Sequence, residues 1–547
     1  MMIYINILLV CLLSACQPPF MDSSLGKSGC RRCHDVQLDP AHDIGCRSCH
    51  HGRPEGYSRA QAHKGLIPMP SHPSLMARTC GKCHAGEVTV AGSSIHFTLS
   101  GMIGTVWSGF FPGEQVPTLL ELPIEEPPCT ERGLVSDALR RRCLRCHVYY
   151  QGDDYTGTAR GTGCAACHLG IRAERPWDHR FRRKVPDTRC LSCHYGNFVG
   201  WDYYGRFEMD YEDDYRVPLV EGEHIQRPYG MEWHNMTPDV HRTAGMVCTD
   251  CHRSGPCGDE KRDVKCLDCH LGDKTGSHPG PPMDRKRIGH RPEDADLVAC
   301  AACHGLWAVR DRGRSLIRQD MPDFDDWSYL AVQGSSEIEA AVKNYVNLPY
   351  EDWIIPRMVD KITGEYRQGL WFESFTERRW SPVKLGEDAH GRLVVIRPVL
   401  DLSLSYVDSD GVVRFDNLRP KTVDDDLSSG NAARPDALSF WLPYSPHTIG
   451  PSDAFRTIYV QSWLNRRLSE SNDVNIRRTR YILPWSGCLF PGFKAHSLQA
   501  GEAVQSGPRS KPCKRQTAPA AGHGRQLPQW PRVHRIFTNN QLILTLD

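Results

Sequence analysis

Alternating apolar and polar positions are clearest in the last third of the chain. Leu402–Val407 has the order Leu-Ser-Leu-Ser-Tyr-Val, a period of two that is typical of a half-buried β-strand. Asp410-Gly411 follows, a pair that favours tight hairpin turns, and Val412–Phe415 then continues the strand pattern. Residues 392–397 predict another strand, which ends at Pro398. This part of the chain is therefore expected to be rich in β-strands.

Helical patterns are short. Ser336 and Glu339 form a capping box ahead of the run Ala340–Val342 and predict the start of a short helix. Residues 30–304 are rich in proline and glycine, for example around Pro70 and Gly161, which favours loops and short helices. We expect a mostly irregular fold with short helices, followed by a small mixed α/β or β-rich C-terminal appendage.

One motif dominates residues 30–304, where Cys-x-x-Cys-His occurs nine times. Residues at i, i+3 and i+4 share one face of a helical turn, so two thiols and an imidazole reach one side of a single ligand. This spacing is that of c-type haem attachment, in which the thiols form thioether bonds and the imidazole becomes an axial iron ligand. The predicted attachment residues are Cys30, Cys33, Cys46, Cys49, Cys80, Cys83, Cys143, Cys146, Cys164, Cys167, Cys190, Cys193, Cys248, Cys251, Cys266, Cys269, Cys300 and Cys303. The predicted proximal ligands are His34, His50, His84, His147, His168, His194, His252, His270 and His304.

Two other interpretations use the same cysteines. Paired Cys-x-x-Cys units could form tetrahedral zinc sites, but nine units leave one over, and zinc gives no reason for the histidine after every second cysteine. A disulfide framework is possible in an exported chain, but a bridge between cysteines three residues apart closes a small loop and adds little stability. Only haem attachment uses every motif residue. No function is assigned to four remaining cysteines: Cys129, Cys257, Cys488 and Cys513.

Nine covalently bound haem c groups would also account for the composition. A chain of 547 residues normally buries a sizeable apolar core, yet only 40% of this one is hydrophobic. Porphyrin would supply the missing apolar mass, so we expect the polypeptide to be organised around nine stacked haems. Without them, residues 30–304 should not fold.

The motifs fall into three groups of three, which predict three haem modules. Their boundaries are placed at residues 16–142, 143–247 and 248–304. A haem-free segment at 305–460 and a basic tail at 461–547 follow. The tail carries thirteen Lys and Arg against four acids, a net charge of +9 that leaves −8 on the rest of the chain. Its frequent Pro, Gly, Ser and Gln predict disorder, and it lacks the interleaved aromatic residues of a nucleic-acid-binding segment.

Each haem iron needs a second axial ligand, and histidine gives lower potentials than methionine. Outside the motifs, residues 17–304 contain eleven histidines, against five in residues 305–547. The expected distal ligands are therefore His42, His51, His63, His72, His96, His179, His224, His234, His241, His278 and His290. Four methionines are alternatives, although each is more often a packing residue: Met102, Met231, Met236 and Met246.

The middle module is short of candidate ligands. Between its first and last motif residues, 143 and 194, His179 is the only non-motif histidine, although this range holds three motifs. At least one of the haems on His147, His168 and His194 must therefore take a ligand from elsewhere or keep an open position. A ligand taken from another module would lock the modules together.

The chain begins with an apolar run that is too short to span a bilayer and ends in small residues, like a secretory signal peptide at residues 1–15. Leu13–Cys16 resembles a bacterial lipobox, which implies cleavage before Cys16 and lipid on its thiol. No Lys or Arg precedes the run, which departs from the pattern, and an ordinary secretory signal is the alternative. Gln17 in place of Asp implies an outer-membrane lipoprotein, at the periplasmic face or the cell surface.

Over roughly residues 30–460 the chain resembles the large multihaem c-type cytochromes of metal-reducing and related bacteria. The resemblance rests on the nine motifs and, less specifically, on Ser94–Met102, His241–His252 and Glu377–Val383. It implies electron transfer through bis-histidine haems, often across or outside an outer membrane. In such proteins a segment like Pro446–Thr448 often precedes a further motif, which is absent here. We hypothesise that the reading frame changed near this point, which would leave His447 an orphaned ligand.

Three functions fit these patterns. An electron conduit that exchanges electrons with other redox proteins or an outer-membrane complex is favoured, because histidines are numerous enough to close the irons. A multihaem reductase of nitrite, hydroxylamine or tetrathionate is the alternative, and it needs one open haem in the middle module. Its candidate substrate residues are Arg141, Arg142, Arg172, Tyr203 and Tyr204. A subunit of a larger conduit, docking through residues 305–460, is compatible with the first.

Overall fold

The structure is a computed structural model. It describes residues 29–170, 178–197, 200–208, 219–220, 223–224, 227–253, 264–270, 286, 290–310, 314–322, 333–347, 349, 355–374, 378–421, 441–473, 533–538 and 541–546. The chain divides into two compact units, Met1–Pro491 and Gly492–Asp547, and the second contains an antiparallel hairpin of β18 (Val533–Thr538) and β19 (Gln541–Leu546). The predicted signal peptide and Cys16 lie outside the described residues.

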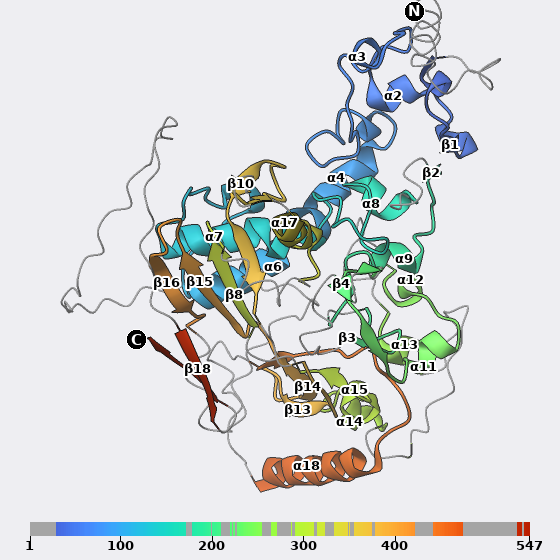
Figure 1. The fold of residues 1–547 in the computed structure, drawn as a ribbon. Helices are drawn as coiled ribbons and strands as arrows, with labels where there is room; N and C mark the ends of the chain where they lie inside the picture. Colours follow the sequence, from blue (N-terminus) through green and yellow to red (C-terminus); the bar gives the residue numbers. More distant parts are fainter. Residues whose placement is uncertain are drawn as a thin grey trace, which may run out of the picture. The chain divides into compact units, whose positions relative to one another are not determined.

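Each Cys-x-x-Cys-His motif lies in or directly follows a helix of at most five residues (Figure 1). The turn brings the motif side chains to one face: the N–H of His84 donates to the carbonyl of Cys80 at 2.9 Å, and His194 bonds Cys190 at the same distance. These helices are η1 (Gly29–Arg32), α2 (Cys46–His50), η3 (Cys80–Lys82), η5 (Cys143–Cys146), α8 (Cys164–His168), α9 (Asp187–Cys190), α12 (Cys248–Cys251), α13 (Cys266–His270) and α15 (Cys300–His304).

The remaining described helices are mostly short as well. They are η2 (Pro40–His42), α3 (Arg59–Ala62), α4 (Ala85–Ser93), α5 (Ile95–Thr98), α6 (Ser100–Phe110), η4 (Leu119–Glu121), α7 (Glu131–Arg141), α11 (Val240–Thr243), α14 (Pro292–Ala295), α17 (Ser336–Asn347) and α18 (Ala454–Asp473). Helix α17 begins at Ser336, as its capping box predicts. No helix in the described ranges is both long and apolar enough to cross a membrane.

The largest described sheet has four strands in the order β11-β8-β15-β16. The strands are β8 (Arg314–Gln319), β11 (Leu370–Glu373), β15 (Leu402–Val407) and β16 (Val413–Leu418); β8 and β15 are parallel and the other pairs antiparallel. The predicted hairpin is present as β15 and β16, closed by the turn at Asp410-Gly411. A three-stranded sheet contains β13 (Lys384–Glu387), β14 (Leu393–Pro398) and β17 (Trp441–Pro443).

Two-stranded pairings connect other parts of the chain. They are β1 (Gln37–Leu38) with β2 (Asp178–His179), β3 (Arg206–Glu208) with β6 (Trp233–Asn235), β4 (Leu219–Val220) with β5 (Glu223–His224), β7 (Ala308–Val309) with β12 (Trp380–Ser381), and β9 (Arg357–Val359) with β10 (Tyr366–Gln368). The first pair is parallel and joins the predicted first and second modules, while β7 and β12 join residues within the 305–460 segment.

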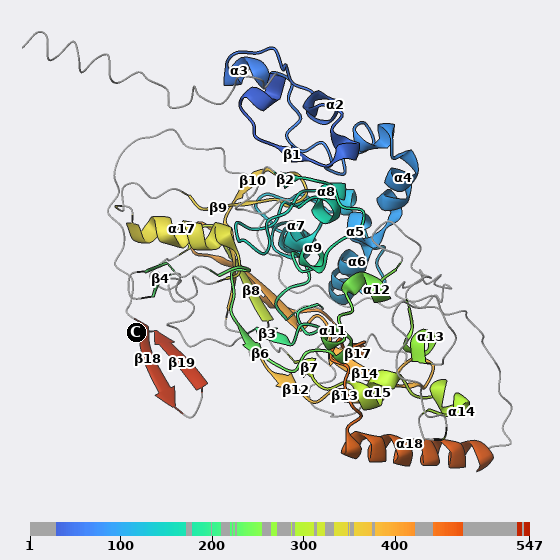
Figure 2. The same ribbon diagram turned by 90° about the vertical axis from the view of Figure 1, so that its right-hand side faces the viewer.

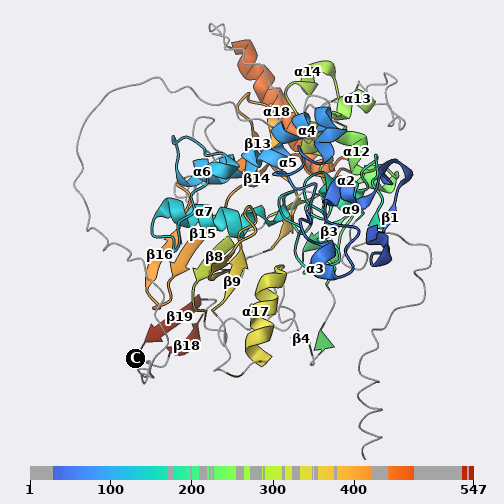
Figure 3. The same ribbon diagram turned by 90° about the horizontal axis from the view of Figure 1, so that it is seen from above.

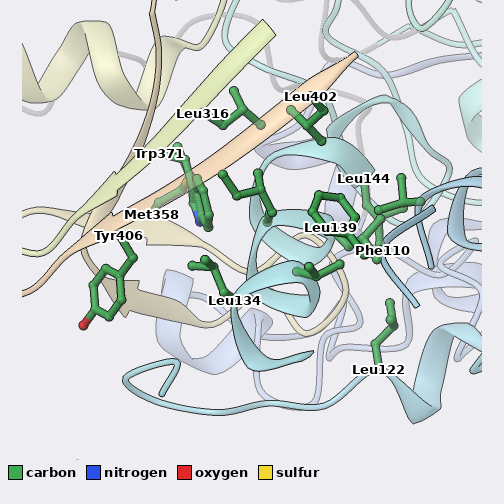
Figure 4. Close-up of a cluster of buried hydrophobic side chains, with 14 of the residues drawn as sticks. Phe110, Leu122, Leu134, Leu139, Leu144, Leu316, Met358, Trp371, Leu402 and Tyr406 are labelled. Atoms are coloured by element: carbon green, nitrogen blue, oxygen red, sulfur yellow. The ribbon is translucent and has the colours of Figure 1, made fainter. Parts of the chain in front are cut away.

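The four-stranded sheet does not form a separate appendage, which corrects the expectation from the sequence. Its buried face shares one apolar cluster with α6 and α7, which precede the fourth motif (Figures 3 and 4). Leu134 and Leu139 of α7 lie with Trp371 and Leu404 of the sheet, and all four are fully buried. Residues 99–144 thus pack on a sheet whose strands lie between residues 314 and 418, at least 170 positions further along the chain. The local sequence pattern could not reveal this association.

Replacing Leu139 with alanine should lower the free energy of unfolding by about 2–5 kcal/mol, because it leaves a cavity in this cluster. Chemical denaturation of the haem-loaded protein measures the change. Leu120→Ala is the matched control, since Leu120 is 78% exposed. Equal losses in the two variants would show that α7 does not pack as described.

Three consecutive arginines tie the end of α7 to the strands. Arg140 pairs with buried Asp360 at 2.6 Å, and Arg142 pairs with Glu373 at 2.8 Å. Arg141 donates to backbone carbonyls of residues 367–369. Burial opposes the charge of Glu373, but Arg314, Arg142 and Arg378 outweigh it and lower the pKa of this carboxyl. Because Cys143 follows directly, these contacts fix the fourth motif to the sheet.

The predicted boundary between residues 460 and 461 is wrong, because α18 runs through it to Asp473. Val460, Trp463 and Leu464 recur at helical spacing and are buried against Ala302 of the ninth motif (Figure 2). The composition of the tail as a whole, which is basic and rich in Pro, Gly, Ser and Gln, does not reveal this short apolar pattern at its start. The start of the tail instead completes the packing around α15.

Candidate haem centres

Seven motif histidines face a second histidine across a gap of similar width. The pairs, with the distance between ring centroids, are His34–His63 (6.0 Å), His50–His179 (6.1 Å), His84–His42 (6.3 Å), His194–His96 (6.4 Å), His252–His447 (6.1 Å), His270–His241 (6.1 Å) and His304–His290 (5.9 Å). Each pair combines one motif histidine with one histidine from outside the motifs, and no histidine occurs twice. Ordinary aromatic packing gives no reason for that selectivity.

The gap fits a metal ion held between the rings. With metal–nitrogen bonds of about 2.0 Å and each nitrogen roughly 1.1 Å from its ring centre, two imidazoles on opposite sides of one ion have centres about 6 Å apart. A direct N–H···N hydrogen bond of about 2.9 Å would bring the same centres to about 5 Å. The residues present therefore fit bis-histidine ligation of haem iron.

The outer nitrogen of several of these rings is held by the backbone. Nδ1 of His50 lies 2.8 Å from the carbonyl of Ile67, and Nδ1 of His304 lies 3.0 Å from that of Gly450. His168 makes the same contact with Arg182 at 2.8 Å. A carbonyl oxygen can only accept a hydrogen bond, so the N–H of the imidazole must be at Nδ1. Nε2 is then the unprotonated nitrogen with a free lone pair. This tautomer and orientation are those of a metal-ligating histidine.

Two of the facing pairs exchange histidines between the first and second predicted modules. His50 of the first module faces His179 of the second, and His194 of the second faces His96 of the first. The pairing of β1 with β2 brings His179 to its place. The shortage of histidines in the second module led us to expect a ligand from elsewhere, and His96 lies in that position.

His447 was not among the predicted ligands, and the expectation that it is orphaned does not fit the structure. It lies opposite His252, 195 positions earlier in the chain. Its backbone N–H donates to Asp202 at 3.3 Å, and that of Ile449 donates to Asp239 at 2.7 Å. Gly450, three residues on, accepts from His304. The segment 447–450 thus contacts histidines of two motifs, His252 and His304. In the sequence, the only indication that His447 could be a ligand was the resemblance of Pro446–Thr448 to segments of multihaem cytochromes.

Three predicted distal ligands do not face a motif histidine in the part of the chain that is described. His51 lines a cavity of about 560 Å³ together with Arg47, Arg53 and Lys64. His72 lies edge-on to Tyr149, and His234 lies beside Trp380. All three motif histidines nearest to His51 in sequence already face another ring. The side chain of His224 and all of His278 lie outside the described residues.

Two motif histidines, His147 and His168, have no facing histidine among the described residues. His147 is half-buried, and its Nε2 is buried and has no hydrogen-bond partner among the described residues. Burial, with smaller contributions from His96 and Arg160, lowers the pKa of His147 to about 3, so the ring is neutral, the form that binds metals. Among the described histidines that face no motif histidine, His72 lies near both motifs: it is edge-on to Tyr149, and the hydroxyl of Ser71 donates to the carbonyl of Thr162 just before the fifth motif.

Neighbouring motifs meet through their cysteines. Four pairs of thiols from different motifs lie close together: Cys30 with Cys46, Cys80 with Cys164, Cys190 with Cys248, and Cys266 with Cys300. Three further pairs are close enough to interact electrostatically: Cys49 with Cys80, Cys146 with Cys193, and Cys251 with Cys269. The N–H of Gly163 donates to Val148 at 2.7 Å and joins the fourth and fifth motifs. The motifs therefore adjoin in the order 1-2-3-5-4-6-7-8-9.

The structure lends no support to the other interpretations of the cysteines. All eighteen motif cysteines are free thiols, so none forms a disulfide. No group of three or more His, Cys, Asp or Glu in the described residues could hold a metal ion, whereas a structural zinc site needs four ligands. Outside the motifs, Cys129 is disulfide-bonded.

The residues considered for an oxyanion substrate have structural partners instead. Besides the contacts of Arg141 and Arg142 described above, the hydroxyl of Tyr203 donates to the carbonyl of Met246 at 2.8 Å. Tyr204 donates to Asp187 at 2.6 Å. Arg172 lies outside the described residues. These groups stabilise the fold around the motifs, and none of the four described ones is available to a substrate.

No family model, curated protein or solved structure matches the chain.

Proposed function

We propose that this chain is a multihaem c-type cytochrome that relays electrons through a row of mostly bis-histidine haems. The observation that carries the proposal is the set of seven facing pairs, each joining a motif histidine to a non-motif histidine at 5.9–6.4 Å. Bound haem c supplies one-electron redox chemistry. The chain supplies the tethers, the axial ligands and the spacing between centres.

The protein groups in this proposal have separate tasks. The two cysteines of each motif would tether the haem covalently, and the motif histidine would bind its iron. In the seven facing pairs the second histidine would also bind the iron and would leave no site for a substrate. Contacts between thiols of consecutive motifs keep neighbouring tethers close, so electrons can be relayed over short distances along the order given above.

The setting of this relay is part of the same proposal. The lipobox-like Leu13–Cys16 and the need to attach haem c outside the cytoplasm support export and a lipid anchor at the bacterial outer membrane. Other redox proteins, or an outer-membrane conduit, would deliver and accept the electrons.

A second candidate function is reduction of a small oxyanion at an open haem. The observation in its favour is that His147 and His168 have no facing histidine in the described ranges, while His194, the third candidate, faces His96. The open position would therefore belong to the fourth or the fifth motif.

Low-temperature electron paramagnetic resonance of the oxidised protein separates these functions. The conduit predicts low-spin ferric signals from all nine haems. A high-spin signal worth one haem or more, altered by added nitrite or hydroxylamine, would favour the reductase. Fewer than seven low-spin haems would contradict both, because seven pairs of histidines face one another.

A further inference from the structure

Two of the seven facing pairs contain a histidine whose outer nitrogen contacts a carboxylate. Nδ1 of His42 lies 2.9 and 3.0 Å from the two carboxylate oxygens of Asp39. Nδ1 of His241 lies 2.8 Å from Oδ1 of Asp239. In both cases the histidine is the one from outside the motif, opposite His84 and His270 respectively.

The other non-motif histidines differ in this respect. Nδ1 of His96, His290 and His447 is buried and has no hydrogen-bond partner among the described residues. The carboxylate of Asp202 lies 3.9 Å from Nδ1 of His447, which is beyond hydrogen-bonding distance. The pairs therefore fall into chemically distinct classes: His42 and His241 have a charged acceptor on Nδ1, whereas His96, His290 and His447 have none within hydrogen-bonding distance among the described residues.

Both aspartates are held in place by backbone N–H groups. Asp39 is the N-cap of η2 and accepts from Ala41 at 3.1 Å and from Phe181 at 2.9 Å. Asp239 is the N-cap of α11 and accepts from the backbone of His241 at 2.8 Å and of Ile449 at 2.7 Å. These bonds fix the carboxylates against the imidazoles.

We propose that Asp39 and Asp239 are positioning residues that give the centres at His84 and His270 the lowest reduction potentials of the bis-histidine set. The inference rests on the proposed function. A carboxylate that accepts the Nδ1 proton makes the imidazole a stronger electron donor, which favours the oxidised, more positively charged centre. Each reduction adds one electron and moves no proton, because the Nδ1 proton stays on the histidine.

The centres at His84 and His270 lie near the two ends of the row of motifs. In the order of adjoining motifs they are third from one end and second from the other. Electrons crossing the protein would meet a low-potential step near each end, with the centres at His147, His168, His194 and His252 between the two steps.

Spectroscopic redox titration of the haem-loaded protein, with dithionite as reductant, tests the proposal. Asp39→Asn and Asp239→Asn each keep an oxygen acceptor but remove the charge. Each should move one of the nine one-electron transitions, from the low end of the range, to higher potential, and the double variant should move two. Asp43→Asn is the matched control, because Asp43 follows His42 directly but pairs with Arg31; it should move none.

Intact mass and the ferric spectrum of each variant keep this test separate from that of the proposed function. Nine attached haems, unchanged low-spin signals and an unmoved titration would overturn the inference and leave the conduit intact. Loss of attached haem already in the unsubstituted protein would overturn the conduit. If an asparagine variant loses haem, Asp239→Ser, which keeps a hydroxyl acceptor without charge, must give the same upward shift or the inference fails.

Discussion

Made without haem, the chain is expected to be unfolded over residues 29–98 and 240–270. The motif helices η1, α2, α12 and α13 contain no buried residue. Within residues 29–98 the buried apolar side chains are those of Met76, Ala91 and Phe97, which pack with Val148 and Ala166 beside the fourth and fifth motifs. In small metal-dependent domains the binding free energy of the metal is the folding free energy, and removal of the metal unfolds them. Residues 99–144 and the four-stranded sheet share a continuous cluster and should keep more protection.

Limited proteolysis compares the two forms directly. The chain made in cells lacking haem attachment should be cleaved first within residues 29–98, while the haem-loaded chain resists under the same conditions. The cluster around Leu139 is the internal control, because only Cys143 and Leu144 among its residues belong to a motif. Equal resistance of residues 29–98 in both forms would mean that the polypeptide alone stabilises this segment.

Replacing His447 with alanine is expected to remove one axial ligand from the centre at His252. Roughly one-ninth of the low-spin ferric signal should become high-spin, since one of nine haems is affected. The number of attached haems should not change, because Cys248 and Cys251 still form the tether. Electron paramagnetic resonance and intact mass together measure both quantities.

His390→Ala is the matched control for this prediction. His390 lies exposed in the turn after β13 and should contribute to no centre. A His447→Ala spectrum identical to that of the control would show that His447 is not the ligand.

The short helices at the motifs were predictable from the sequence, because each motif occupies about one helical turn. The distal partners were not, because they come from distant segments. His42, His63, His96, His179, His241 and His290 were predicted and face motif histidines, whereas His51, His72 and His234 do not in the described structure. A count of histidines indicates how many ligands are available but not which ring reaches which motif.

Some missed features did have a local signal. The capping aspartates lie two or three residues before His42 and His241, a spacing visible in the sequence. Helix α18 shows apolar residues at i, i+3 and i+4 from Val460 onward. By contrast, the pairing of Arg140 with Asp360 joins residues that are 220 positions apart. Such contacts between distant residues explain why the fourth motif could not be placed against the sheet from its surroundings in sequence.

The number of haem groups covalently attached to this chain can be measured by intact mass spectrometry of the exported protein. We expect a mass increase equal to nine haem groups, with peptides carrying haem at each of the nine Cys-x-x-Cys-His motifs. Eighteen unmodified motif thiols, or clearly fewer than nine additions in a folded protein, would contradict this expectation.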